Sequence, residues 1–219
     1  MNGELSEAHI RSGRVMTVRG PVSAQDLGVT LMHEHILNDC QCWWHAPKTS
    51  QREHLAEGAV RIEILGELRQ DPFVNKHNIK LDDEPLSIAE LKDFAAEGGR
   101  TVVEPTCQGI GRDPAALRRI SHATGLNIVM GAGYYLASSH PQKVAGMSVD
   151  AIADEIVREA LDGADGTDVK IGLIGEVGVS SDFTADEQKS LRGAARAQLR
   201  TGLPLMVHLP GWFRLGHRV

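Results

Sequence analysis

The fold of this chain is decided by four short apolar runs: RTVVEPT (100–106), LNIVMGAG (126–133), VKIGLIGEVG (169–178) and LPLMVHLPG (203–211). Each run is rich in aliphatic residues and has the length of a buried strand. A fifth run, VTLMHEHIL (29–37), precedes them. Helical patterns of about a dozen residues separate the last four runs, and strands that alternate with such helices predict a parallel sheet of an α/β fold.

The segments between the predicted strands begin and end with helix-capping signals. An aspartate followed by proline satisfies the free N–H groups at a helix start, and so does a serine or threonine followed three residues later by glutamate. A glycine after the last helical residue permits the left-handed conformation of a C-cap. These signals predict helices that begin at or near Ser87, Asp113, residue 148 and Thr184.

Two segments lie outside this alternation. Residues 1–27 are expected to form an N-terminal extension with a β-hairpin, whose turn is near Gly20-Pro21. Residues 53–71 show the pattern of an amphipathic helix in an insertion. No low-complexity linker divides the remainder, so residues 28–219 are expected to form one further domain.

The composition excludes several classes of protein. The chain has 219 residues, 42% of them hydrophobic and 24% charged, and a formal net charge of −6, which is typical of a globular domain. No run of Lys and Arg indicates nucleic acid binding, and no stretch approaches the roughly 18 apolar residues of a membrane span. The polar N-terminus carries no apolar h-region, so we do not expect secretion, and three cysteines do not make a disulfide framework. We therefore expect a cytoplasmic protein with neither nucleic acid nor membrane as a partner.

Histidines and a glutamate stand at the ends of three predicted strands. His33 and His35 alternate on the first strand, so both imidazoles project from one face, and neutral imidazole is a favoured zinc ligand. Glu176 ends the fourth strand in an apolar run, where an unpaired carboxylate is costly to bury, and His208 ends the fifth. Each residue alone is more often a surface or core side chain. Because the carboxyl ends of parallel strands meet at one edge, the four together predict a metal site, with Glu104 as an outer partner for a ligating histidine.

The loop GIGRDP (109–114) mimics the turn that binds a dinucleotide. Pro114 stands where the third glycine of that fingerprint belongs, which argues against a nicotinamide oxidoreductase. Arg112 in this loop is expected to form a salt bridge rather than to contact substrate.

A second metal motif is suggested by Cys40, Cys42 and His45. No fourth ligand stands at a suitable spacing, so free thiols in a loop are the favoured interpretation. Trp43 and Trp44 beside them either line the pocket or cover the rim.

Five ordered blocks resemble the phosphotriesterase-like branch of the amidohydrolase superfamily: VTLMHEHIL, CQGIGRDP, NIVMGAGYY, KIGLIGEVGVSS and MVHLPGW. The chain is similar to phosphotriesterase-related proteins, including bacterial members labelled resiniferatoxin-binding, from about Gly13 to its last residue. The resemblance implies a TIM (β/α)8 barrel of the metal-dependent hydrolase type. Such a barrel takes about 250 residues or more, so residues 28–219 are expected to be its N-terminal part, truncated after about five of eight βα units.

The resemblance also implies roles for the strand-end residues. His33 and His35 would hold the more buried metal, Glu176 would bridge two metals where many members use a carboxylated lysine, and His208 would bind the more exposed metal. Tyr135 would lie at the pocket mouth, where it either donates a hydrogen bond near the bridging site or packs on substrate. Two further ligands of the family, a histidine after strand six and an aspartate after strand eight, have no assignable counterpart.

The function that the resemblance implies is metal-dependent hydrolysis of a small-molecule substrate. A pair of divalent ions, usually Zn²⁺ with Mn²⁺ or Co²⁺ as alternatives, would supply a bridging hydroxide that attacks an ester, lactone, amide or phosphotriester. The alternative is a barrel that binds a small apolar ligand without turnover. A full-length form is compatible with a homodimer, whereas the chain alone is expected to be poorly soluble or inactive, because open sheet edges are exposed.

Overall fold

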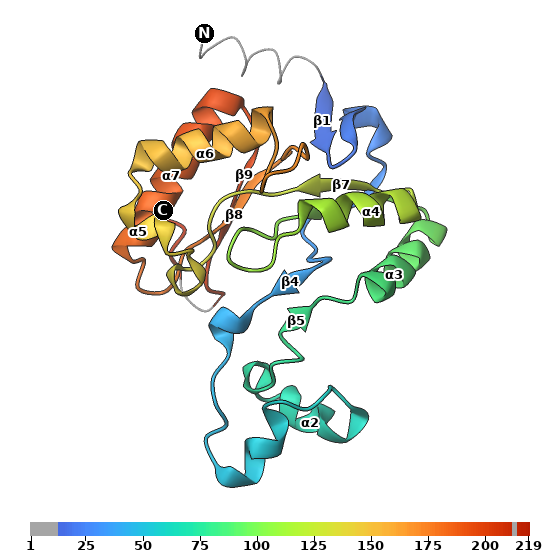
Figure 1. Ribbon diagram of the computed structural model, residues 1–219, viewed down its shortest axis with the longest axis vertical. Helices are drawn as coiled ribbons and strands as arrows, with labels where there is room; N and C mark the ends of the chain where they lie inside the picture. The colour runs from blue at the N-terminus through green and yellow to red at the C-terminus, as the bar shows by residue number, and fades with distance from the viewer. Residues whose placement is uncertain (1–12, 212–213) are drawn as a thin grey trace.

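The computed structural model describes residues 13–211 and 214–219. Parallel strands lie at its centre with helices packed outside them, and a long excursion projects from one end of the molecule (Figure 1). The first twelve residues of the predicted N-terminal extension, and Trp212 of the last sequence block, lie outside the described residues. Among the described residues, no helix is both long and apolar enough to cross a membrane.

Among the described residues, five parallel strands follow one another in chain order. β6 pairs with β3 on one side and with β7 on the other, and β8 pairs with β9. The N–H groups of Gly175 and Gly178 donate to the carbonyls of Ala132 and Tyr134, which joins β8 to the segment after β7. The α/β class and the predicted strands are therefore confirmed. The strands are β3 (Val29–Leu31), β6 (Gly99–Glu104), β7 (Asn127–Met130), β8 (Ile174–Gly178) and β9 (Leu205–His208).

The connecting helices begin and end at the residues that favour such boundaries. The Asp113 side chain caps α4 by accepting the N–H of Ala116, and Gly125 ends α4 with a φ of 76°. Thr184 and Glu187 form the predicted capping box of α7. These local signals were sufficient to place both helices. The helices are α3 (Glu84–Ala96), α4 (Pro114–Thr124), α5 (Lys143–Gly146), α6 (Val149–Leu161) and α7 (Ala185–Thr201).

The predicted start of α3 at Ser87 is wrong. The N-cap is Asp83, whose side chain accepts the N–H of Leu86 at 2.9 Å, and Pro85 lies in the first turn. An aspartate caps a helix as well as a serine does, and proline is favoured in the first turn, so the earlier start is the more stable one. The Ser87 hydroxyl instead donates to the Ile36 carbonyl at 3.1 Å.

A β-hairpin covers the end of the sheet at which the strands begin. Its turn lies at Val18 and Arg19, two residues before the predicted position, and Gly20 opens the second hairpin strand. The N–H of Val18 donates to the carbonyl of Ile128 in β7 at 2.9 Å, which fixes the hairpin to the sheet. The hairpin strands are β1 (Arg14–Thr17) and β2 (Gly20–Ser23), followed by the short 3-10 helix η1 (Ala24–Asp26).

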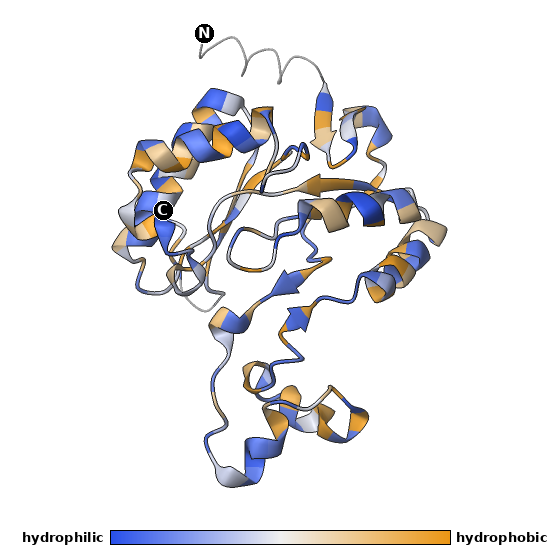
Figure 2. Ribbon diagram, in the orientation of Figure 1, coloured by the Kyte–Doolittle hydropathy of each residue, from blue (hydrophilic) through white to orange (hydrophobic). Residues whose placement is uncertain are grey.

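The hydrophobic core lies between the strands and the helices. β7 is apolar after Asn127 and is coloured mostly as hydrophobic in Figure 2, and Ile128 and Met130 on it are fully buried. Ile174 in β8, Ile120 in α4 and Ile152 in α6 are also fully buried and belong to the same cluster. The strands are thereby fixed in register, and their carboxyl ends are held at one edge of the sheet.

An excursion, residues 40–79, leaves the sheet between β3 and α3. It contains 3-10 turns and a four-residue helix, so the long amphipathic helix predicted over residues 53–71 is wrong. The chain folds back on itself here, because the buried Asn75 side chain donates to the carbonyls of Leu55 and Gly58. Apolar residues of this segment form a separate small core: Leu55, Ile64, Leu68 and Val74.

Two short strands form the base of the excursion, where they pair antiparallel. The elements of this region are β4 (Asn38–Asp39), η2 (Gln41–Trp43), η3 (Ser50–Leu55), η4 (Ile62–Ile64), α2 (Leu65–Leu68), η5 (Pro72–Val74) and β5 (Lys80–Leu81). One further 3-10 helix, η6 (Ala137–Ser139), follows β7.

Candidate metal centre

Three imidazoles surround one carboxylate at the carboxyl ends of the strands. The side chain of Glu176 is only 3% exposed; its Oε1 lies 3.2 Å from His35 Nε2, and its Oε2 lies 3.4 Å from His33 Nε2 and 3.1 Å from His208 Nδ1. The possible ligand atoms of His33, His35 and Glu176 all lie within 4.8 Å of one another. The structure thus brings together the four residues that the sequence predicted as metal ligands, and their binding of a metal stays a prediction.

The backbone around β3 explains why both histidines face Glu176. β3 ends at Leu31, but the N–H of Glu34 still donates to the carbonyl of Val103 in β6 at 3.0 Å. The chain therefore stays beside β6 although it bends at Met32 and His33. His33 and His35 face Glu176, whereas the exposed Glu34 does not join the group.

The charge state of Glu176 suits a divalent cation. Burial by itself would raise the pKa of this carboxyl, but hydrogen bonds to His208 and His35, together with their charge, outweigh burial and lower the pKa to about 2. For His35 the contact with Glu176 also outweighs burial: burial lowers the pKa of this imidazole, the contact raises it, and the net pKa is raised. The ion-pair partners of Glu176 among the described residues are all histidines. An ionised carboxylate among imidazole nitrogens is a donor set that fits Zn²⁺.

A second chain of hydrogen bonds holds His35 from behind. His35 Nδ1 lies 2.8 Å from Thr106 Oγ1, and the Thr106 hydroxyl also contacts the carboxylate of Glu104. Glu104 is fully buried, and burial raises its pKa to about 7. A proton on His35 Nδ1, donated to this chain, leaves the lone pair of Nε2 facing Glu176. Glu104 therefore supports His35 as the sequence suggested, but through Thr106, which sequence reasoning missed.

Tyr135 lies directly against the ligand set. Its hydroxyl is 3.1 Å from His208 Nε2, and the two rings meet edge to face with centroids 4.7 Å apart. Burial raises the pKa of Tyr135 well above its ordinary value, so the phenol stays protonated near neutral pH. The indole N–H of Trp43 donates to the Tyr135 oxygen at 3.3 Å. A hydrogen bond near the bridging site and packing on substrate, the two roles that the sequence left open for Tyr135, both require a position next to the proposed ligands.

The segment that carries Trp43 contains no disulfide. Cys40 and Cys42 are free thiols, as the sequence predicted, and burial raises the pKa of Cys40 to about 11. Trp43 stacks on Phe73 with ring centroids 5.3 Å apart, and the indole N–H of Trp44 donates to a carbonyl of the excursion. Sequence reasoning left the role of Trp43 open, since only the folded excursion brings it to Tyr135.

Arg112 forms the salt bridge that the sequence predicted. Its side chain is fully buried and bonds to the carboxylates of Glu159 and Asp165 and to the carbonyl of Gly131. These contacts occupy all five N–H groups of the guanidinium. The loop after β6 is therefore held to α6 by a buried ion pair, and Arg112 has no donor left for a substrate.

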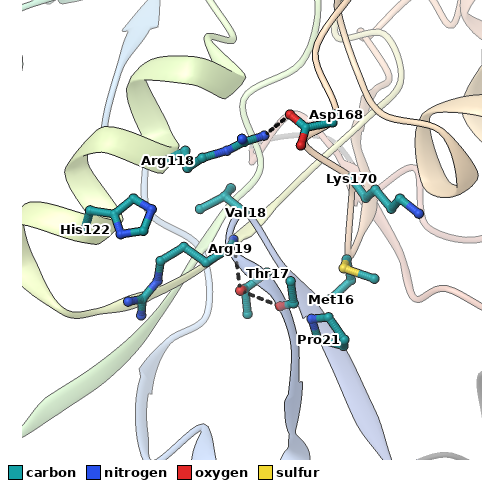
Figure 3. A pocket seen from close by; sticks show the side chains of 10 residues that line it. Met16, Thr17, Val18, Arg19, Pro21, Arg118, His122, Asp168 and Lys170 are labelled. Carbon is teal, nitrogen blue, oxygen red and sulfur yellow. Dashed lines mark hydrogen bonds and ion pairs between the residues drawn. The ribbon is translucent and has the colours of Figure 1, made fainter.

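A separate hollow of about 350 Å³ lies at the other end of the strands, beside the hairpin (Figure 3). Arg118 crosses it to pair with Asp168, whereas Lys170 and Arg19 point to opposite sides. Ligand sites have polar groups that converge on one position, and these cations do not converge. The metal centre is therefore the better candidate for the functional site.

Comparisons with known proteins match nearly the whole chain. Residues 13–216 match the family model of the Phosphotriesterase family. The chain is 42% identical over 201 residues to the N-acetyltaurine hydrolase of Tetraodon nigroviridis, a match that covers 91% of this chain and 57% of that protein. It is also 42% identical over 203 residues to a phosphotriesterase-related protein of Nematostella vectensis, covering 91% of this chain and 58% of that protein.

A solved structure shows the same fold. The crystal structure of a resiniferatoxin-binding protein from Rhodobacter sphaeroides is 70% identical in sequence, with a TM-score of 0.96 over 99% of this chain and 60% of that chain. The chain thus spans less than two thirds of the length of each of these three proteins. Over residues 13–216 it belongs to the phosphotriesterase family, whose fold is of the TIM-barrel type.

Proposed function

We propose that this protein is a metal-dependent hydrolase and that the described residues carry most of its metal centre. The observation that carries the proposal is the convergence of His33, His35 and His208 on the buried carboxylate of Glu176. Membership of the phosphotriesterase family supports it. The chain spans 57% of the length of a relative named N-acetyltaurine hydrolase. In this proposal, the five parallel strands correspond to the first five of an eight-stranded barrel.

The proposed ligands divide between two ions. His33 and His35 would hold the more buried ion, Glu176 would bridge both, and His208 would bind the second through Nδ1, the nitrogen that faces Glu176. Zn²⁺ is the ion that we propose, with Mn²⁺ and Co²⁺ as alternatives. When bound, such ions lower the pKa of a coordinated water and polarise a carbonyl or phosphoryl oxygen.

The protein's own residues prepare the site for this chemistry. Glu176 supplies the negative charge that draws cations to the three imidazoles, and Thr106 keeps the Nε2 lone pair of His35 directed at the same point. Tyr135, protonated and adjacent to His208, can donate a hydrogen bond to a substrate oxygen on which negative charge grows.

The proposed substrate is a small molecule with an ester, lactone, amide or phosphotriester bond. A relative at 42% identity bears the name N-acetyltaurine hydrolase, which favours an amide of a small acid. Each of these bonds places a polarisable oxygen next to the atom that water attacks, so one site suits them all.

Hydrolysis of a substrate panel tests the proposal. The panel contains an aryl ester, a lactone, N-acetyltaurine and a phosphotriester, each offered to the full-length form in its zinc-loaded and chelator-treated states. We expect turnover of at least one compound, its loss on chelation and its return with Zn²⁺. Glu176→Gln is expected to abolish turnover, whereas Glu90→Gln, at an exposed carboxylate on α3, should leave it unchanged. Binding of an apolar ligand by the zinc-loaded protein without any turnover would instead favour a non-catalytic barrel.

A further inference from the structure

Trp43 reaches the candidate metal centre from outside the strands. It lies on η2 in the excursion, and its indole nitrogen is 3.3 Å from the Tyr135 hydroxyl. The Trp43 ring stacks on the ring of Phe73, which also lies in the excursion. Trp43 and Cys42 also pack against a buried cluster beneath the site: Cys107, Ile110, Tyr135 and Leu136. The excursion is thereby attached to the site by one hydrogen bond and an apolar contact.

The chemistry of the three groups fixes the direction of these hydrogen bonds. An indole N–H can only donate, so the Tyr135 oxygen accepts from Trp43. The other polar neighbour of that oxygen is His208 Nε2 at 3.1 Å. An imidazole whose Nδ1 lone pair is used by a metal carries its proton on Nε2 and also donates. The Tyr135 oxygen then accepts two hydrogens, and its own hydrogen points away from both donors.

We propose that Trp43 is a positioning residue that acts through Tyr135. Its N–H holds the phenol beside His208 and directs the O–H hydrogen of Tyr135 toward a substrate oxygen. The catalytic consequence rests on the proposed function, whereas the hydrogen bond itself does not. Trp44 provides a matched comparison, because its indole N–H donates to the Val74 carbonyl at 3.2 Å, within the excursion.

The hydrogen bond is tested without turnover, by NMR of protein labelled with ¹⁵N at the tryptophan indoles. The signal of Trp43 is assigned from Trp43→Phe and that of Trp44 from Trp44→Phe. In Tyr135→Phe the indole proton of Trp43 is expected to move upfield, because its acceptor is gone, while the Trp44 signal stays in place. If the Trp43 signal does not move, or if both signals move equally, Trp43 does not donate a hydrogen bond to Tyr135 and the proposal is overturned.

The positioning role is tested by kinetics on a substrate that the wild-type protein hydrolyses. Trp43→Phe keeps the ring and removes the N–H; we expect kcat to fall about tenfold, the size of one hydrogen bond, with KM nearly unchanged. Trp44→Phe should leave kcat and KM within about twofold of the wild-type values. The hydrogen bond that it removes lies within the excursion, away from the reacting atoms. All variants should retain the zinc content of the wild type.

The double variant decides whether Trp43 acts through Tyr135. In a Tyr135→Phe background, Trp43→Phe should cause no further loss, because the group that it positions is already absent. Independent, multiplicative losses, or a loss confined to KM, overturn the proposal. If the wild-type protein hydrolyses no compound of the panel, the proposed function fails, and the NMR result still decides whether Trp43 holds Tyr135.

Discussion

Removing the Thr106 hydroxyl should weaken metal binding at a centre that the substitution does not touch directly. Thr106 is fully buried, and its Oγ1 lies 2.8 Å from His35 Nδ1 and 3.2 Å from the Leu37 carbonyl, besides its contact with Glu104. Thr106→Val has nearly the same shape but leaves His35 Nδ1 without a partner. The imidazole is then free to turn, or to shift its proton to Nε2, and either change removes a ligand lone pair.

The magnitude follows from the part that Thr106 plays. Loss of an outer partner of a metal-bound histidine typically weakens binding about 10- to 100-fold, which corresponds to about 1.4–2.7 kcal/mol. Leaving buried polar groups unpaired also destabilises the metal-free fold, by about 1–3 kcal/mol. Thr106→Ser keeps the hydroxyl and should retain most of the affinity.

The assay is competition for Zn²⁺ against a chromophoric chelator, with wild-type, Thr106→Val and Thr106→Ser proteins compared at one pH. Thermal unfolding of the metal-free proteins separates loss of affinity from loss of folded protein. Wild-type affinity in Thr106→Val would refute the reasoning, and so would equal losses in the valine and serine variants.

Two further predictions concern buried charges. The pKa of Glu104 is raised from 4.5 to about 7, so between these pH values the native state retains a proton that the unfolded chain releases. The free energy of unfolding therefore falls as the pH rises through this window, by up to roughly 3 kcal/mol. In Glu104→Gln this part of the pH dependence should vanish in urea unfolding of metal-free protein, and an unchanged profile would contradict it. Arg112→Met leaves the 6%-exposed Glu159 carboxylate without its ion-pair partner and should cost about 3–5 kcal/mol. Arg119→Met, at a solvent-exposed pair with Glu84, should destabilise the protein far less. Similar losses of stability in the two variants would contradict a buried, structural ion pair at Arg112.

The sequence predicted those features whose signals are local or are imposed by parallel topology. Asp113 and Gly125 bound α4 through contacts within a few residues, so the sequence alone placed this helix. The proposed ligands are far apart in the chain, but each lies in or just after the last few residues of a strand, and parallel strands bring these ends together. For this reason His33, Glu176 and His208 could be grouped before any distance was known.

The features that sequence reasoning missed depend on packing between distant segments. Residues 53–71 have a helical pattern, yet a small core and the hydrogen bonds of Asn75 fold them into 3-10 turns. Ser87 and Asp83 compete as caps of α3, and the proline after Asp83 favours the earlier start. Thr106 and Trp43 carry no local signal, because their partners belong to other elements of the fold.

Anomalous diffraction at the zinc edge, from crystals grown with Zn²⁺, tests the metal centre most directly. We predict a strong anomalous peak for a zinc ion within bonding distance of Nε2 of His33, Nε2 of His35 and the Glu176 carboxylate. A second ion, where present, should give a peak beside His208 Nδ1. The first peak should be absent in Glu176→Ala. Zinc bound elsewhere on the chain, with the three imidazoles still in direct contact with Glu176, would contradict the proposed metal centre.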